Sequence, residues 1–236
     1  MKWKQVFTSS LGKKIVMSFT GLSLILFLLV HCYVNANVLF SNGEENFNRA
    51  AHFMGSNILI RIMEIGLFAG FILHIVQGYM LEAQNRAKRT VKYAVSAGNV
   101  NSKWYSRSMA LLGTLILLFL IVHLVHFWVP SRFGGLQPVT YGEDEMHNLY
   151  ARMQDIFQQW WVIGLYILGC FSLAWHLVHG FQSAFQTLGL SNRKYIGIIK
   201  NTGIVFSIVV PLVFALMPIF MHFGWEIPVG GLTLLF

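Results

Sequence analysis

Five long apolar stretches dominate the chain, and nearly all of its charge lies between them. They cover residues 15–38, 57–82, 108–129, 160–188 and 201–224. A membrane-spanning helix needs about 20 apolar residues, and each stretch is long enough. The short alternating segments of a membrane β-barrel do not occur in the sequence, and backbone polar groups inside a bilayer must be satisfied locally. The sequence therefore predicts an all-α polytopic membrane protein, with residues 1–236 forming one membrane domain.

The composition excludes a water-soluble domain. Hydrophobic residues make up 56% of the 236 residues and charged residues 11%, whereas soluble chains contain about 25% charged residues. The net charge of +8 would suggest nucleic acid in a soluble protein, but here it reflects loop charges beside a membrane, and we expect no nucleic-acid partner. Cys32 and Cys170 fall inside apolar stretches, so they indicate no disulfide framework.

The basic residues predict the orientation of the spans. With five spans, 13 of the 17 lysines and arginines fall on one side of the membrane. They are Lys2, Lys4, Lys13, Lys14, Arg86, Lys88, Arg89, Lys92, Lys103, Arg107, Arg193, Lys194 and Lys200. Because cytoplasmic loops are enriched in Lys and Arg, we expect a protein of the cytoplasmic (inner) membrane with its N-terminus cytoplasmic and its C-terminus outside. The basic face would attract acidic membrane lipids or an acidic soluble partner.

Six of the nine histidines lie inside four of the apolar stretches. They are His31, His74, His123, His126, His176 and His179. Ionisable residues within spans are rare and usually functional. Counting along the helices places His31 and His123 on the outer side of the bilayer centre. The same count places His74 and His176 on the inner side, in a second layer roughly 15 Å away, the rise of about ten helical residues.

Two layers of paired histidines predict two haem groups. A six-coordinate b-type haem needs one histidine on each face of its iron, and facing helices of a four-helix bundle can supply them. A mononuclear zinc site would need three or four ligands at one depth, which this layering does not provide. We therefore expect two haem b groups in a four-helix core, with His31, His74, His123 and His176 as axial ligands and the fifth helix peripheral.

Glycines accompany these four histidines at regular spacing. Gly78 and Gly180 follow His74 and His176 by four residues, and Gly21 and Gly113 precede His31 and His123 by ten. A flat porphyrin needs close backbone approach, which glycine permits. The spacing favours His123 over His126 as a ligand. It likewise favours His176 over His179, and the two disfavoured residues would then form hydrogen bonds with a haem propionate, a carbonyl or water.

Three further polar residues lie near the predicted outer boundary of the second span. Arg61 and Glu64 are three residues apart, a spacing typical of a local ion pair. Alternatively, Arg61 neutralises a haem propionate, or Glu64 serves a quinone. His52 precedes the span at a place where an outer quinone pocket would need a proton relay. His52 and Glu64 are therefore candidates for a quinone site, and Arg61 is a candidate for cofactor binding.

Several motifs occur in an order and spacing that point to a known family. They are Ser10-Leu11-Gly12-Lys13-Lys14, Val30-His31, Phe47-Asn48-Arg49-Ala50-Ala51-His52-Phe53-Met54, Arg61 with Glu64, Leu73-His74 with Gly78, Gly113 with Phe119 and His123, and Gly164-Leu165-Tyr166-Ile167-Leu168-Gly169 leading to His176 and Gly180. Over nearly all of residues 8–225 the chain resembles the single-subunit, five-helix, diheme cytochrome b anchor of succinate dehydrogenase and fumarate reductase.

This resemblance implies roles and partners. His31 and His123 would bind the haem distal to the catalytic subunits. His74 and His176 would bind the proximal haem. A flavoprotein and an iron–sulfur subunit would dock on the cytoplasmic face, and a quinone, menaquinone or ubiquinone, would react near the distal haem. The chain would be the quinone-reactive electron-transfer subunit of a respiratory oxidoreductase and would carry out no dicarboxylate chemistry itself.

Two other functions remain open at this point. With the same haems, the chain could be the cytochrome b of a hydrogenase, formate dehydrogenase or nitrate reductase. Without haem, it could be a small transporter that uses intramembrane histidines as a proton relay, and a purified protein lacking a Soret band would favour that function. Transporters often contain inverted repeats and broken helices, and the sequence shows no matching Gly/Pro interruptions.

Overall fold

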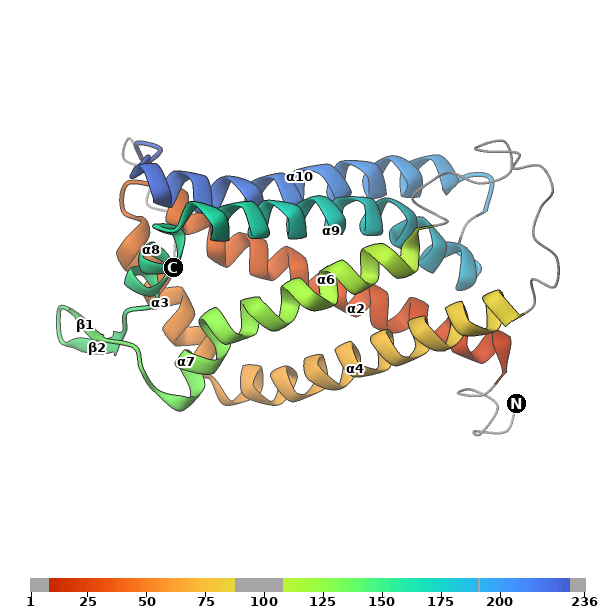
Figure 1. Cartoon of the computed structure of the whole chain (residues 1–236), viewed down its shortest axis with the longest axis horizontal. Coiled ribbons are helices and arrows are strands. Elements are labelled where there is room, and N and C mark those ends of the chain that lie inside the picture. The colour runs from red at the N-terminus through yellow and green to blue at the C-terminus, as the bar shows by residue number, and fades with distance from the viewer. Residues whose placement is uncertain (1–8, 88–107, 191, 230–236) are drawn as a thin grey trace. The chain divides into compact units, whose positions relative to one another are not determined.

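The computed structural model describes residues 9–87, 108–190 and 192–229, and these are mainly helical (Figure 1). The long helices are α2 (Ser10–Ala36), α4 (Ile58–Ala87), α6 (Met109–His123), α9 (Trp160–Thr187) and α10 (Ile196–Phe223). The shorter elements are the 3-10 turn η1 (Asn37–Leu39), α3 (Gly43–Ser56), the π-helix η2 (Leu124–Trp128), α7 (Val129–Phe133), β1 (Pro138–Tyr141), β2 (Asp144–His147) and α8 (Leu149–Phe157).

Five helical segments of the described residues are long and apolar enough to cross a membrane. They are Leu11–Leu39, Ile58–Ala87, Met109–Phe133, Trp160–Thr187 and Ile196–Phe223. This confirms the prediction of an all-α polytopic membrane protein. Within the described part of the chain, the only strands form one short hairpin.

Several of the predicted helix boundaries are wrong by a few residues. The second span continues to Ala87 instead of ending at residue 82, the third continues to Phe133 instead of 129, and the fifth begins at Ile196 instead of 201. Arg86 and Lys200 lie within these extensions. A long basic side chain can lie along a helix while its charged end reaches water, so basic residues do not mark the helix ends.

Large apolar side chains cover the outer surfaces of the spans. Ile58, Ile65 and Phe19 expose 75%, 73% and 69% of their surface. In water, leaving such a side chain exposed forgoes about 1.5–3 kcal/mol of burial free energy. Lipid tails are as apolar as these side chains, so the same surface is stable in a bilayer.

The residue contacts group the chain into two compact units. Unit 1 comprises Met1–Phe27, Ile65–Leu115 and Ser172–Ile208, and unit 2 comprises Leu28–Glu64, Ile116–Phe171 and Val209–Phe236. Each unit contains one segment of each of the five long helices. The expectation of a single membrane domain stays a prediction.

Unit 2 has a core of buried apolar side chains in which the fifth span takes part. Met217 and Met221 of α10 belong to this core, together with residues of η1, α3, α8 and α9. The expectation of a merely peripheral fifth helix therefore understates its role within unit 2. Another close contact lies between α6 and α9, where a Cβ atom on Gly169 would come within 2.6 Å of Phe119 Cδ2.

The short elements of unit 2 form a polar cap built on α3, α8 and the hairpin (Figure 1). Strands β1 and β2 pair antiparallel, with Tyr141 opposite Asp144. Gly142 between them has a positive φ of 67°, a conformation that glycine adopts at little cost. Asn148 then begins α8, where its side chain accepts a hydrogen bond from the Ala151 N–H at 2.9 Å.

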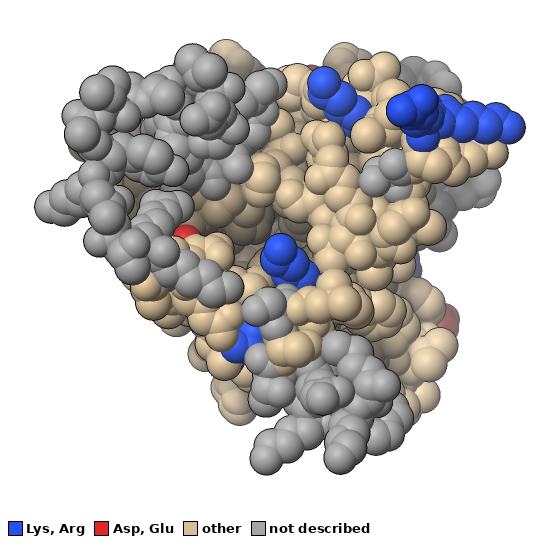
Figure 2. Space-filling view, turned by 90° about the vertical axis from the view of Figure 1, so that its right-hand side faces the viewer, with Lys and Arg blue, Asp and Glu red and all other residues tan. Residues whose placement is uncertain are grey.

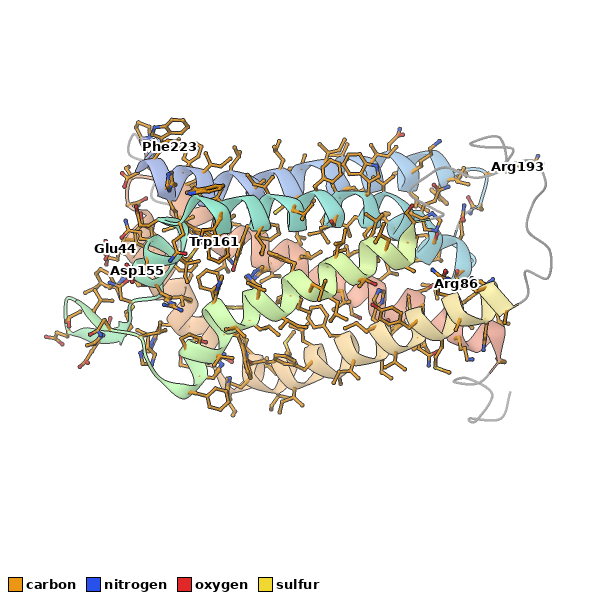
Figure 3. The ribbon with its side chains drawn as sticks, viewed as in Figure 1. Glu44, Arg86, Asp155, Trp161, Arg193 and Phe223 are labelled. Atoms are coloured by element: carbon orange, nitrogen blue, oxygen red, sulfur yellow. The ribbon has the colours of Figure 1, made fainter. Side chains whose placement is uncertain are left out.

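Unit 1 carries basic side chains at one end. Arg86 on α4 and Arg193 before α10 lie at the same end of this unit (Figure 3). Among the described residues on that face, lysine and arginine are the charged side chains that stand out (Figure 2). The predicted basic residues Lys2, Lys4, Lys88, Arg89, Lys92, Lys103 and Arg107 lie outside the described residues. The orientation of the chain in the membrane stays a prediction.

Candidate functional site

His31 and His123 lie together in unit 2. His31 is on α2 and His123 is the last residue of α6, and their ring centres are 5.8 Å apart with the ring planes at 84°. The Asn35 amide nitrogen lies 3.3 Å from His31 Nδ1 and donates to the His31 carbonyl oxygen at 2.7 Å. The Nδ1 atom of His123 is buried and has no hydrogen-bond partner among the described residues.

Aromatic rings surround this pair. The ring centres of Phe119 and Tyr166 lie 5.7 and 6.1 Å from that of His123. The ring centre of Phe214 from α10 lies 5.6 Å from that of His31. Aromatic rings exclude water and lower the local dielectric constant, conditions that help to set the potential of a redox group.

His74 and His176 form a second pair, within unit 1. His74 is on α4 and His176 on α9, and their ring centres are 6.2 Å apart with the planes at 65°. Thr20 Oγ1 lies 3.2 Å from His74 Nδ1, while the buried Nδ1 of His176 has no hydrogen-bond partner in the described part of the chain. A Cβ atom on Gly21 would lie 3.4 Å from His74 Cε1, and one on Gly113 would lie 3.8 Å from His176 Cε1.

The spacing within each pair fits two axial ligands of one iron. With metal–nitrogen bonds of about 2 Å, two imidazoles on opposite sides of a metal have ring centres about 6 Å apart. In each pair, one buried ring nitrogen without a partner among the described residues is available to a group that the chain does not supply. A zinc site with three or four ligands fits less well, because the described residues contain no group of three or more His, Cys, Asp or Glu that could hold a metal.

The two neighbouring histidines form hydrogen bonds with protein groups. His126 Nδ1 lies 2.9 Å from the Tyr166 hydroxyl, and the two rings are parallel within 2°. His179 Nε2 lies 3.2 Å from the Ser183 hydroxyl, one turn along α9. These partners differ from the propionate, carbonyl or water expected from the sequence. Because a hydrogen bond occupies one nitrogen of each ring, His126 and His179 have protein partners that need no haem.

Glu64 is the centre of a cluster of donors in unit 2. Its carboxylate accepts hydrogen bonds from Arg61 Nη1, from Trp128 Nε1, and from Arg132 Nη2 at 3.1 Å. The Glu64 side chain is only 16% exposed. The sequence predicted the Arg61–Glu64 pair, but it missed Trp128 and Arg132. Both are more than sixty positions away along the chain, so no local spacing could have indicated them.

A π-helix connects one histidine ligand candidate to this cluster. Residues Leu124–Trp128 form η2 immediately after His123, and Trp128 at its end donates to Glu64. A π-turn contains an extra residue and shifts the phase of the residues that follow it, and such turns are frequent at functional sites. Arg132 of α7 follows one turn later and reaches the same carboxylate. The candidate ligand His123 and two of the three Glu64 donors, Trp128 and Arg132, therefore belong to one continuous segment.

His52 is not part of this cluster. It lies on α3 with an exposed side chain, and its carbonyl accepts a hydrogen bond from the Ser56 hydroxyl at 2.8 Å. Within the described residues, no hydrogen bond or ion pair joins the His52 ring to Glu64. The structure therefore pairs Arg61 with Glu64, and among the described residues no hydrogen bond or ion pair joins the His52 ring to either of them.

Comparisons of the chain with protein-family models, with curated proteins and with solved structures found no match. Any functional assignment therefore depends on the residues themselves. The chain offers two pairs of imidazoles at ligand spacing, one in each unit, and a carboxylate with three donors at the end of a membrane span. Chemically, each pair can supply two imidazole ligands to one metal centre, and the carboxylate cluster can exchange hydrogen bonds with a polar molecule.

Proposed function

We propose that the chain is the cytochrome b membrane anchor of a succinate:quinone or quinol:fumarate oxidoreductase. In this role it binds two haem b groups and passes electrons between an iron–sulfur subunit and a membrane quinone. The proposal depends mainly on the two histidine pairs. Their ring centres are 5.8 Å apart in the His31–His123 pair and 6.2 Å apart in the His74–His176 pair. The order of the sequence motifs supports the choice of this enzyme class.

The chain holds each haem between helices that face one another. In unit 2, α2 and α6 supply His31 and His123. In unit 1, α4 and α9 supply His74 and His176. A bis-histidine haem supplies one-electron transfer when bound, at a potential set by its ligands, hydrogen bonds and burial. The chain fixes the imidazoles, keeps water out with apolar side chains, and sets the local hydrogen bonds.

The Glu64 cluster is the better of the two candidates for the quinone site. Two arginines and an indole N–H surround the Glu64 carboxylate, so the site offers both hydrogen-bond donors and a proton-accepting group. Quinone carbonyls need donors, and quinone reduction takes up protons. Arg61 then serves the quinone site or a haem propionate. His52 is exposed and outside the cluster, which leaves it the weaker candidate.

The proposed partners are a flavoprotein and an iron–sulfur subunit that carry out the dicarboxylate chemistry. The basic face in Figure 2 suits docking of an acidic protein surface. The proposal places this face on the cytoplasmic side of the inner membrane, with the C-terminus outside, and menaquinone or ubiquinone as the redox partner in the membrane.

The function is tested on the whole complex purified from native membranes through a tag on this chain. We expect a flavoprotein and an iron–sulfur protein to co-purify. Under anaerobic conditions succinate should reduce the haem iron, which is followed in the haem absorbance spectrum. A quinol should give the same reduction, and fumarate should reoxidise it. The matched controls are His126→Ala and His179→Ala, which should retain this behaviour.

Co-purification of a hydrogenase, formate dehydrogenase or nitrate reductase instead, with haem that succinate does not reduce, would identify a different complex. A colourless chain that purifies alone would support the transporter alternative and end the proposal.

A further inference from the structure

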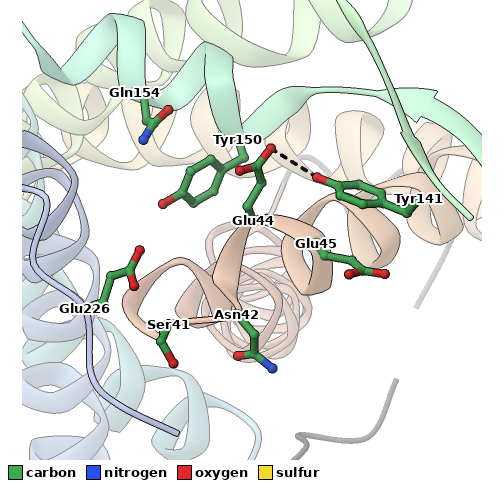
Figure 4. Close-up of a pocket in the computed structure, with 8 residues that line it drawn as sticks. All are labelled: Ser41, Asn42, Glu44, Glu45, Tyr141, Tyr150, Gln154 and Glu226. Atoms are coloured by element: carbon green, nitrogen blue, oxygen red, sulfur yellow. Dashed lines mark hydrogen bonds between the residues drawn. The ribbon is translucent and has the colours of Figure 1, made fainter.

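Unit 2 contains a pocket of about 360 Å³ in its polar cap, and no histidine of either pair lines it. It is lined by Ser41, Asn42, Glu44, Glu45, Tyr141, Tyr150, Gln154 and Glu226 (Figure 4). The proposed electron-transfer function makes no use of it. Its volume lies at the lower end of the range for small-molecule sites, about 300–1,000 Å³.

A fully buried amide fixes the two tyrosines of this pocket. Asn48 on α3 has 0% exposed surface. Its Nδ2 donates to the Tyr141 hydroxyl and to Asn148 Oδ1, each at 3.0 Å, and its Oδ1 accepts from the Tyr150 N–H at 3.0 Å. One side chain therefore joins α3 to β1 and α8. The pocket walls are preorganised by a buried hydrogen-bond network.

The segment after α10 is fixed against the opposite wall. Ile227 N–H donates to the Leu39 carbonyl at 2.7 Å, and Ser41 N–H donates to the Ile227 carbonyl at 3.1 Å. This short parallel bridge pairs Phe40 with Ile227. Glu226 is thereby held at the edge of the pocket by backbone hydrogen bonds.

Three carboxylates give the pocket a negative charge. Glu44 accepts a hydrogen bond from the Tyr141 hydroxyl at 3.2 Å, and Glu45 forms an ion pair with Arg49 at 2.8 Å. Within the described residues, no ion pair neutralises Glu226. Arg49 is also shared with Asp144. The described residues therefore leave an excess of negative charge beside the pocket.

Besides the carboxylates, the Tyr150 hydroxyl also points to a ligand. The residue is only 8% exposed, and Figure 4 shows its hydroxyl directed into the pocket. No described residue forms a hydrogen bond with this hydroxyl, since the only bond of Tyr150 to another side chain uses its backbone N–H. Burial raises the pKa of the Tyr150 phenol, and the charges of Glu226 and Glu44 raise it further, so the hydroxyl stays neutral at pH 7.

The lining selects the chemical class of the ligand. Carboxylates repel anions, and the described residues contain no group of three or more possible metal ligands, so the pocket does not fit an inner-sphere metal ion. A primary ammonium group has three N–H donors. It can donate to carboxylates and to a neutral hydroxyl, and it is attracted to the faces of tyrosine rings.

We propose that this pocket binds a primary ammonium group, with Glu44, Glu226 and the Tyr150 hydroxyl as its acceptors. Two sources share this chemistry: a soluble alkyl diamine and the headgroup of an ethanolamine lipid. The pocket begins at Ser41, just after the span that ends at Leu39, and Glu226 follows closely on the span that ends at Phe223. It therefore lies close to the ends of two spans and can be reached from water or from headgroups.

The test uses the full-length chain in a maltoside detergent, which carries no amine. Titration calorimetry with 1,4-diaminobutane at low ionic strength should show saturable binding at one site per chain. Tyr150→Phe removes only the hydroxyl and should weaken binding about tenfold, and Glu226→Gln should weaken it at least as much. The matched controls are Tyr195→Phe and Glu143→Gln, whose residues do not line the pocket; both should bind as the wild type does.

A second arm separates the two sources. The titration is repeated in micelles containing either phosphatidylethanolamine or phosphatidylcholine. A lower diamine affinity with the ethanolamine lipid alone identifies the headgroup as an occupant, and equal affinities identify the soluble amine. Absence of saturable diamine binding would overturn the proposal, and so would unchanged binding in both Tyr150→Phe and Glu226→Gln. It would also be overturned if Mg²⁺, at the same concentration of charge, competed with the diamine as well as another primary amine does.

Discussion

The two histidine pairs have similar ring spacings but different surroundings. In unit 2, aromatic rings from three helices pack around His31 and His123. In unit 1, the neighbours of His74 and His176 include two glycine positions, the Thr20 hydroxyl and the Met17 backbone. One unit therefore positions its imidazoles by side-chain packing, and the other by close backbone approach. The potential of a haem depends on its surroundings, so the two proposed haems should differ in potential and in their tolerance of substitutions.

The largest effect is expected from Gly169→Val in unit 2. The new Cβ would come within 2.6 Å of Phe119 Cδ2 and 2.7 Å of its Cγ, so the ring beside His123 must move. Overpacking of this kind typically costs about 1–3 kcal/mol. We expect loss of the unit 2 haem and retention of the unit 1 haem, measured by the pyridine haemochrome assay and redox titration. The matched control is Gly164→Val on the same helix, where a Cβ meets nothing within 4 Å; a similar haem loss there would contradict the packing argument.

Gly21→Leu is the corresponding change in unit 1. Its side chain would extend from a Cβ already 3.4 Å from His74 Cε1, so the larger side chain crowds the imidazole. We expect loss of the unit 1 haem alone, again measured as haem per chain. Gly70→Leu is the control, because a Cβ at Gly70 meets nothing within 4 Å. If Gly21→Leu removed the unit 2 haem instead, the assignment of the pairs to separate haems would be wrong.

Glu64→Gln tests the polar site of unit 2 without changing its volume. Both haems should remain, and quinone-linked turnover of the assembled complex should fall about tenfold or more, because a charged hydrogen-bond acceptor contributes about 1.5–3 kcal/mol. Glu82→Gln in unit 1 is the control, since within the described residues Glu82 forms a local i,i+4 ion pair with Arg86, whose side chain is 72% exposed. Equal turnover in the two variants would remove Glu64 from the quinone site.

The smallest effect is expected from Tyr166→Phe, which removes the hydrogen bond to His126 at 2.9 Å. Loss of a partly buried hydrogen bond costs about 1 kcal/mol, so we expect a lower melting temperature and a small shift in the unit 2 haem potential. Tyr79→Phe in unit 1 removes an exposed hydrogen bond to Thr114 at 2.7 Å and should change the melting temperature less. The reverse ranking would contradict the importance of side-chain packing in unit 2.

The sequence predicted the five spans because hydropathy and length alone determine which segments suit a bilayer. It missed helix ends such as Ala87 and Ile196, because the charged residues Arg86 and Lys200 resemble loop residues although both lie within helices. The sequence did not predict the structure of the polar cap of unit 2. Its hairpin and α8 depend on Asn48, which is about a hundred positions from its partners.

The histidine pairs could be anticipated because depth in a membrane follows from position along a helix. The same reasoning could not find the donors of Glu64, since Trp128 and Arg132 reach it from another span. It also could not find the hydrogen bond between His126 and Tyr166. Long-range contacts of side chains carry no periodic signal in a single sequence, so they had to come from the structure.

The haem content of the purified chain tests the two-haem proposal without the partner subunits. We expect two haems per chain in the wild type, and one in each of the four variants His31→Ala, His74→Ala, His123→Ala and His176→Ala. We expect two haems in His126→Ala and in His179→Ala. A colourless wild-type chain, or four ligand variants that keep both haems, would show that these histidines bind no haem.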